Sequence, residues 1–290
     1  MTNTQPPPQN DTELSGDISL SLGDRGRYLW RNFVRNLRTP NPITLTVTRF
    51  DTQDIDDRSF EAKPSSPSRA LTDAFLQHQL PQLISKKNIT VLDIGCGSGR
   101  LSDDLAAQGY HGDYTGVDLG DRFRKDVRYP EAFVRHSIQD SAHNLTDEKK
   151  YDLIVSVSAL EHIHDDEALI SRLSSLLNEN GLGVHFIPSG WGLPVYLWHG
   201  YRQYTLGDIE QKFGRDKTRI YALGGGASFL LHFLFITLGE MIFRLPIRGW
   251  FRGFYIQALR ACLRLDHVLA FFPIMFVVCH GTNKTPGVQA

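Results

Sequence analysis

The sequence has little of what marks several protein classes. Its three cysteines are odd in number and widely spaced, which argues against a disulfide framework and a cysteine metal motif. The net charge of -1 argues against a globally basic nucleic-acid binder. The most apolar stretch, residues 227–243, includes His232 and Glu240 and is shorter than the roughly 20 apolar residues that a membrane span needs. No signal peptide is recognisable, so we expect a cytoplasmic protein.

Composition divides the chain into regions. The hydrophobic fraction of 41% allows a sizeable core. Residues 1–23 are rich in Pro, Gln, Asn and Ser, and we expect a disordered tail without a function. Residues 24–69 are predicted to hold a helix, capped by Asp24, and a linker. Residues 70–223 together with 266–282 are predicted to form the core, and residues 224–265 an apolar and basic helical insertion.

Short apolar runs alternate with helical patterns through the predicted core. The runs expected to be strands are 90–94, 114–118, 132–134, 153–157, 182–187, 219–223 and 272–279. The expected helices are 70–83, 102–108, 167–177, which Asn180-Gly181 would end, and one that begins at Thr205. This alternation predicts an α/β fold with a doubly wound, mostly parallel seven-stranded sheet, and a further short strand at 43–47 lies outside it.

A glycine-rich turn follows the first core strand, in the segment Val91 to Arg100 that reads VLDIGCGSGR. Glycines at such a turn allow positive φ and let a ligand approach the backbone closely. The spacing is G-x-G-x-G and not the G-x-G-x-x-G of dinucleotide binding, which counts against NAD. Asp118 stands 19 residues after Gly99 at the end of the next strand, where a carboxylate can accept both hydroxyl protons of a ribose.

These segments resemble the class I S-adenosylmethionine-dependent methyltransferases, whose first motif is similar to Leu92 to Gly99. The similarity continues in register through Gly116 to Leu119, Tyr151 to Val155, Leu160 to Ile163 and Gly181 to Val184. It covers roughly residues 70–223 and the last predicted strand. The resemblance implies a Rossmann-like methyltransferase fold and S-adenosyl-L-methionine as the cofactor.

The resemblance also implies which residues bind the cofactor. Gly95 and Gly97 would pack against its methionine and ribose, Asp93 would support its ammonium group, and Leu119 would flank its adenine. Ser137 stands where the family often has an acidic residue. The full predicted set is Asp93, Gly95, Cys96, Gly97, Gly99, Asp118, Leu119, Ser137, Ile138 and Ser156.

Methyl transfer from a sulfonium depends mainly on alignment of the acceptor with the S–CH₃ bond and on exclusion of water. A hydroxyl acceptor would also need a base of near-neutral pKa, and histidine is the natural type. His199, which follows the fifth core strand, is the first candidate and His162 the second; either could instead be a packed structural histidine. No group of His, Cys, Asp and Glu has metal-ligand spacing, so we predict no metal site.

Two segments concentrate positive charge. Residues 24–40 and 221–264 each carry five arginines and one acidic residue, with aromatic side chains between them. This pattern is typical of helices that lie in an anionic membrane interface, which would make the protein peripheral on the inner membrane face. A cap over the acceptor site, with its arginines in water, would show the same pattern, and RNA binding is a third, weaker reading.

The predicted function is therefore methyl transfer from S-adenosylmethionine to a small-molecule or lipid-like acceptor. The alternative is a methyltransferase-fold protein that binds the cofactor without turnover and serves as an interaction module. An enzyme needs an open cleft beside the sulfonium, whereas a binding module can fill that space with side chains.

Overall fold

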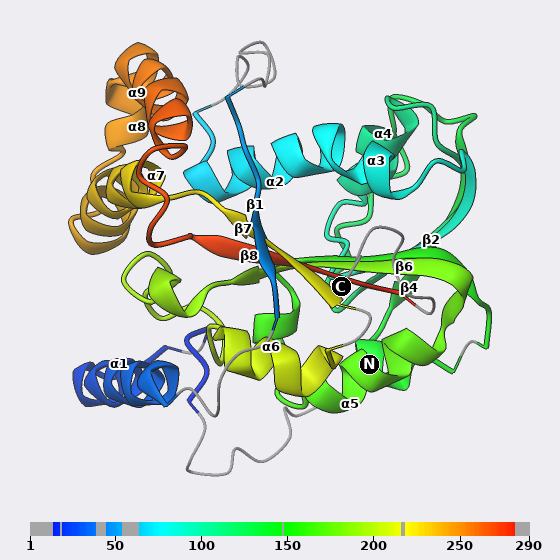
Figure 1. Ribbon diagram of the computed structural model, residues 1–290, viewed down its shortest axis with the longest axis horizontal. Coiled ribbons are helices and arrows are strands. Elements are labelled where there is room, and N and C mark those ends of the chain that lie inside the picture. Colours follow the sequence, from blue (N-terminus) through cyan, green and yellow to red (C-terminus); the bar gives the residue numbers. More distant parts are fainter. Residues whose placement is uncertain are drawn as a thin grey trace.

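One mixed sheet runs through the whole molecule (Figure 1). The computed structural model describes residues 14–17, 19–38, 45–53, 64–146, 148–215 and 218–281. The strands are β1 (Val47–Arg49), β2 (Asn88–Ile94), β3 (His111–Asp118), β4 (Phe133–Gln139), β5 (Tyr151–Val157), β6 (Leu177–Pro188), β7 (Thr218–Leu223) and β8 (Met275–Gly281). Their order in the sheet is β1-β7-β8-β6-β5-β2-β3-β4.

The sheet is mostly parallel, as the alternation of strands and helices predicted. Strand β8 is antiparallel to both of its neighbours, β6 and β7, and the other neighbouring pairs are parallel. All seven predicted core strands are present. The sheet has an eighth strand because β1 pairs with β7, with Val47 opposite Ile220. The predicted strand at 43–47 thus lies partly outside the described residues, and β1 continues beyond it.

Helices cover both faces of the sheet (Figure 1). One face carries α2 (Pro67–His78), α3 (Leu80–Leu83), α4 (Arg100–Ala106), α7 (Gly226–His232), α8 (Ile247–Trp250) and α9 (Arg252–Leu265). The other carries α1 (Leu22–Leu37), α5 (Asp166–Ser175) and α6 (Leu206–Phe213). A separate hydrophobic core lies on each side, one around Phe75 and Phe186 and the other around Leu173 and Ile209.

Local capping explains where several helices begin. Thr205 and Asp208 form a reciprocal capping box at the start of α6, the helix that the sequence predicted to begin at Thr205. Helix α1 begins earlier than predicted, because Ser21 is its N-cap and accepts a hydrogen bond from the backbone N of Asp24. Asp24 therefore lies within the first turn and is not the cap.

Two other boundaries differ from the prediction. Asn180 and Gly181 do not end helix α5, because strand β6 already begins at Leu177. The register between β5 and β6 shifts between Tyr151 and Leu153, which accommodates the additional residues of β6. Pro67 opens helix α2 and is not part of a linker, since Ser66 supplies the N-cap.

The insertion between β7 and β8 is helical, as predicted. Helix α7 continues as the π-helical stretch η5 (Phe233–Ile242), and α8 and α9 follow. The face of α9 that packs inward consists of Tyr255, Leu259 and Leu263, one helical turn apart. Trp250 and Phe254 are exposed. None of the described helices is both long and apolar enough to cross a membrane.

Candidate active site

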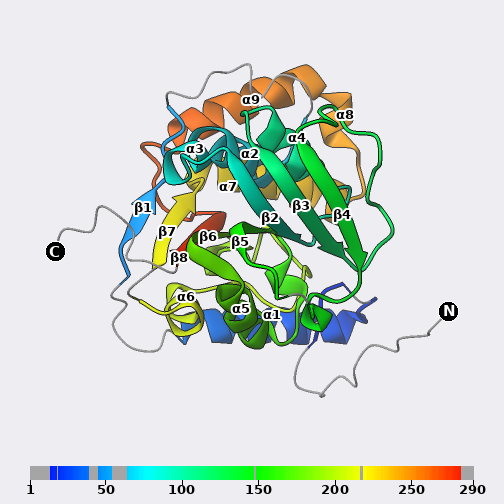
Figure 2. The ribbon, with the colours of Figure 1, turned by 90° about the vertical axis from the view of Figure 1, so that its right-hand side faces the viewer.

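The glycine-rich turn lies at the carboxyl end of β2, where β2, β3 and β4 end at one edge of the sheet (Figure 2). Gly95 and Gly97 have φ values of 73° and 52°, which other residues rarely adopt. A Cβ atom added at Gly95 would lie 2.6 Å from the Cβ atom of Ala159, whereas one added at Gly97 would meet nothing within 4 Å. The turn is therefore closely packed at Gly95 and open at Gly97, where a ligand can reach the backbone.

Asp118 ends strand β3 and faces this turn. Its carboxylate accepts hydrogen bonds from the backbone N atoms of Gly97 and Gly120, both at 2.8 Å. Its side chain is only 14% exposed. A carboxylate offers about four lone-pair directions, so it can still accept hydroxyl hydrogens of a ligand while it holds the turn.

An open cavity of about 400 Å³ adjoins Asp118. The predicted site residues that line it are Gly95, Asp118, Leu119 and His162. The remainder of its wall is Ile94, Val117, Gly120, Arg122, Asp140, Ser141, Ala142, Ser158, Ala159 and Ile163. The cavity therefore joins the carboxyl ends of β2, β3 and β5, where α/β proteins bind their ligands.

A second cavity, of about 210 Å³, lies on the other side of the turn and shares Gly95 with the first. Asp93, Cys96 and Gly97 line it. Burial raises the pKa of Asp93 to about 7, although Tyr114 donates a hydrogen bond to its carboxylate. Burial likewise raises the pKa of the Cys96 thiol to about 12, so this thiol is neutral at neutral pH.

Four residues predicted to bind the cofactor line neither cavity. Ser156 is fully buried and its hydroxyl is 2.8 Å from Nδ1 of His185. Ser137 is exposed on β4, and Ile138 packs into the core beneath it. Gly99 is the N-cap of α4 and lies against Phe123. The segment from Asp140 to Ala142 forms the cavity wall that the sequence suggested for Ser137 and Ile138.

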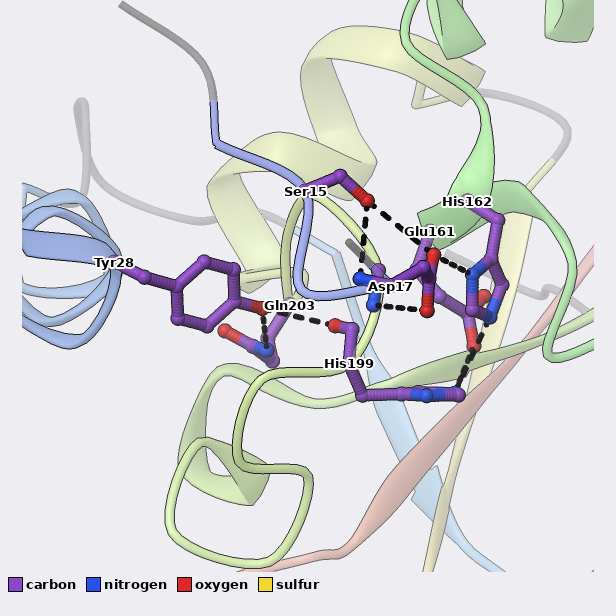
Figure 3. A network of polar contacts seen from close by, with 8 residues as sticks. Ser15, Asp17, Tyr28, Glu161, His162, His199 and Gln203 are labelled. Atoms are coloured by element: carbon purple, nitrogen blue, oxygen red, sulfur yellow. Dashed lines mark hydrogen bonds and ion pairs between the residues drawn. The ribbon is translucent and has the colours of Figure 1, made fainter. Parts of the chain in front are cut away.

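The structure brings the two candidate histidines together (Figure 3). Nε2 of His162 lies 3.2 Å from Nε2 of His199, and Nδ1 of His162 lies 2.5 Å from Oδ2 of Asp17. Burial disfavours the charged form of His162, but the hydrogen bond to Asp17 and the charges of Glu161 and Asp17 together outweigh it and raise the pKa. Burial and the charge of His162 lower the pKa of His199. His162 is thus the more basic ring, and its orientation is fixed by Asp17.

Asp17 belongs to a segment predicted to be a tail without a function. The structure instead docks this segment on the loop that carries His199: the backbone N of Gly16 donates to the carbonyl oxygen of Gly200 at 2.7 Å. Ser15 is buried, at 4% exposure. Tyr28 of α1 holds the same loop by donating to the carbonyl oxygen of His199 at 2.9 Å. No local sequence pattern distinguishes these residues from the polar tail before them.

Glu161 is the other residue to which the sequence analysis assigned no role. Its side chain is fully buried, and among the described residues neither carboxylate oxygen has a hydrogen-bond partner of ordinary geometry. Oε1 of Glu161 lies 3.8 Å from Nε2 of His199. Burial raises the pKa of Glu161 to about 7. Two histidines and two carboxylates therefore converge beside the larger cavity.

Comparison with known proteins identifies related sequences for the central part of the chain. The family model of a methyltransferase domain matches residues 68–206. The ubiquinone biosynthesis O-methyltransferase of Hydrogenovibrio crunogenus is 32% identical over 132 residues, which are 44% of this chain and 50% of the relative. The enzyme of the same name from Glaesserella parasuis is 30% identical over 135 residues, 43% of this chain and 55% of the relative. The chain thus spans about half the length of these curated relatives.

A solved structure extends the likeness in fold over most of the chain. The structure of coclaurine N-methyltransferase bound to N-methylheliamine and SAH has a TM-score of 0.50 and covers 90% of this chain and 94% of its own. Its sequence identity is 12%, so the likeness concerns the fold alone.

Proposed function

Because this chain belongs to the class I S-adenosylmethionine-dependent methyltransferases, we propose that it transfers a methyl group from S-adenosylmethionine to a hydroxyl oxygen of a small molecule. The observation that carries the proposal is the open cavity between Asp118 and His162. On one wall, Asp118 would accept hydrogen bonds from the ribose hydroxyls of the cofactor. On the other wall, His162 would accept the proton of the methyl acceptor. An interaction module without turnover has no need of such an open space.

The cofactor would lie across the glycine-rich turn. The ribose hydroxyls would donate to Asp118, whose position is fixed by Gly97 and Gly120. The adenine would lie between Leu119 and the wall from Asp140 to Ala142. The methionine part would then extend past Gly95 toward the cavity wall formed by Ser158 and His162.

The acceptor would lie on the histidine side of the cavity. In the transfer, the acceptor oxygen forms a bond to the methyl carbon as the bond from that carbon to sulfur breaks, and S-adenosylhomocysteine leaves. The acceptor hydroxyl would lose its proton to the pair of His162 and His199, which lies beside the cavity. The O-methyltransferase names of the curated relatives also favour an oxygen acceptor.

A labelled-methyl assay tests this proposal directly. The purified protein is incubated with S-adenosylmethionine labelled in its methyl group and with separate panels of phenols, alcohols and amines. We expect labelled ether products from hydroxylated acceptors. Transfer to amines only would contradict the oxygen acceptor, and cofactor binding without transfer to any panel or to a small-molecule cell extract would favour the interaction module.

We also propose that the protein associates reversibly with anionic membranes. Helix α1 exposes Trp30 and Leu37, each 67% accessible, and the insertion exposes Trp250 and Phe254 at 62% and 63%. Helices α8 and α9 and helix α1 lie at the left of Figure 1, but on opposite faces of the sheet, so each would make its own contact with the lipid. Arginines on the same helices would approach lipid phosphates while the aromatic side chains enter the interface.

Sedimentation with vesicles tests the association. The protein should sediment with vesicles that contain phosphatidylglycerol and remain in solution with phosphatidylcholine alone, and added salt should reduce binding because it screens the charges. A double substitution, Trp30→Ser with Trp250→Ser, should weaken binding at all salt concentrations. Equal partition into both lipids, or into neither, would favour a cap that closes over the acceptor site.

A further inference from the structure

Four side chains from three distant segments converge beside the larger cavity: Asp17, Glu161, His162 and His199 (Figure 3). We propose that His162, His199 and Glu161 hold a divalent transition-metal ion such as Zn²⁺. Asp17 would fix the orientation of the His162 ring. Only Glu161 and His162 are neighbours in the chain. Asp17 and His199 are each more than 30 positions away from them, so the sequence shows no metal-ligand spacing.

The two imidazole rings are placed as ligands to one ion. Their Nε2 atoms lie 3.2 Å apart and face each other. A tetrahedral ion with bonds of about 2.0–2.1 Å to nitrogen keeps its ligand atoms about 3.4 Å apart, so small movements of the rings would admit it. Asp17, His162 and His199 each have one ligand atom within 4.8 Å of the other two. Glu161 is not part of this group, so its side chain would have to move toward His162 to share the ion.

Glu161 supplies an independent reason for a cation at this point. A fully buried carboxylate without a hydrogen bond of ordinary geometry is costly, because burial removes its hydration and the contact of Glu161 with the Ser158 side chain replaces only part of it. Oε1 of Glu161 lies 3.8 Å from Nε2 of His199, which is too long for a hydrogen bond. An ion between the histidines and Glu161 would give this oxygen its partner.

Asp17 completes the arrangement from outside the ligand set. It accepts a hydrogen bond from Nδ1 of His162, which leaves the lone pair of that ring on Nε2, toward His199. Histidine ligands commonly have such a carboxylate on the other ring nitrogen, which fixes the tautomer and increases the basicity of the ligand. Two nitrogens and one carboxylate oxygen suit Zn²⁺ better than the hard ions Mg²⁺ and Ca²⁺, which prefer oxygen ligands.

The position of the ion suggests its use, and this part of the inference rests on the proposed function. His162 lines the cavity proposed for the acceptor, so a fourth position on the ion would face that space. A hydroxyl bound there would have a lower pKa, because the ion stabilises the oxyanion, and its proton would pass to water in the open cavity. The two histidines would then act as ligands of the ion and not as the base. Metal binding itself can be measured without cofactor or acceptor, so the two proposals can fail separately.

The test begins with full-length protein stripped by a chelator and then titrated with Zn²⁺ by calorimetry. We expect one equivalent to bind. Co²⁺ at the same site should give the visible absorption of a tetrahedral ion with nitrogen and oxygen ligands, and Zn²⁺ should displace it. Substitution of either ligand histidine, His162→Ala or His199→Ala, should abolish stoichiometric binding.

The carboxylate variants separate the two predicted roles. Asp17→Asn should lower Zn²⁺ affinity by about 10- to 100-fold, the usual cost of a lost outer partner, and Glu161→Gln should lower it further. Asp17 is exposed, so its variant remains informative if Glu161→Gln fails to fold. The matched control is Asp51→Asn, which breaks a surface pair with His267 of similar length, 3.0 Å, away from the cluster; it should bind Zn²⁺ as the wild type does.

Two results would overturn the proposal. One is the absence of stoichiometric Zn²⁺ or Co²⁺ binding to the stripped wild-type protein at micromolar concentrations. The other is binding that His162→Ala and His199→Ala leave unchanged, since the ion would then lie elsewhere. In both cases the histidine pair would act directly on the acceptor proton.

Discussion

Replacement of Asp118 by alanine should weaken binding of S-adenosylmethionine more than the same replacement at an exposed acid outside the cavity. The wild-type carboxylate is 14% exposed and already holds the backbone N atoms of Gly97 and Gly120 at 2.8 Å. The two ribose hydroxyls of the cofactor would add charge-assisted hydrogen bonds to it. Such a bond contributes roughly 1.5–3 kcal/mol, and water that enters the alanine variant returns part of that sum.

We therefore expect a net loss of about 1.5–3 kcal/mol in binding free energy, which raises the dissociation constant by about 10- to 150-fold. Isothermal calorimetry with S-adenosylmethionine or S-adenosylhomocysteine measures it. Asp118→Asn keeps one acceptor oxygen, so its cofactor affinity should lie between those of the wild type and Asp118→Ala. Asp121→Ala is the charge-matched control, because Asp121 is exposed and does not line the cavity. An unchanged affinity in a folded Asp118→Ala protein would remove this residue from the cofactor site.

Three further substitutions test other parts of the molecule. In Gly97→Val, calorimetry should detect no cofactor binding, since the side chain would enter the ligand's space. A Cβ atom there meets nothing within 4 Å, but the φ of 52° strains a β-branched residue, so circular dichroism must first show that the variant folds. His199→Ala should lower turnover by roughly a hundredfold at saturating cofactor while cofactor affinity stays the same, and a full rate would return His199 to a structural role. Asp166→Ala should lower the free energy of unfolding in urea by about 3–5 kcal/mol at neutral pH, because it leaves buried Arg202 and half-buried Lys212 without their shared carboxylate. In the wild type these partners hold the pKa of Asp166 below its ordinary 3.8 despite its burial, so its stabilisation is complete above that value and is lost as the pH falls through the lowered pKa.

The arrangement of the glycine turn and the neighbouring strand ends was largely readable from the sequence. A strand, a glycine turn and a helix occur within consecutive residues, so local rules place Gly95 and Gly97 at the carboxyl end of β2. Asp118 follows because β3 is the next strand and pairs with β2 in parallel, which brings the two strand ends together. The third-strand residues were not readable in the same way. Ser137 is exposed on β4, and the cavity wall is formed by the loop that follows.

The sequence by itself determined the α/β class, the glycine turn and the position of Asp118 at the end of the next strand, because each depends on residues close together in the chain or on the periodicity of one element. Only the tertiary structure decided which side chains meet at the proposed acceptor side. Asp17 reaches His162 across 145 positions, and His162 reaches His199 across 37. Those contacts depend on how the segment that carries Asp17 packs against the loop before α6. Hydrophobic periodicity in the sequence does not predict such packing. Burial decided the rest, because Glu161 is an ordinary acidic residue in the sequence and becomes a carboxylate without a hydrogen bond of ordinary geometry only when the packed core excludes water from it.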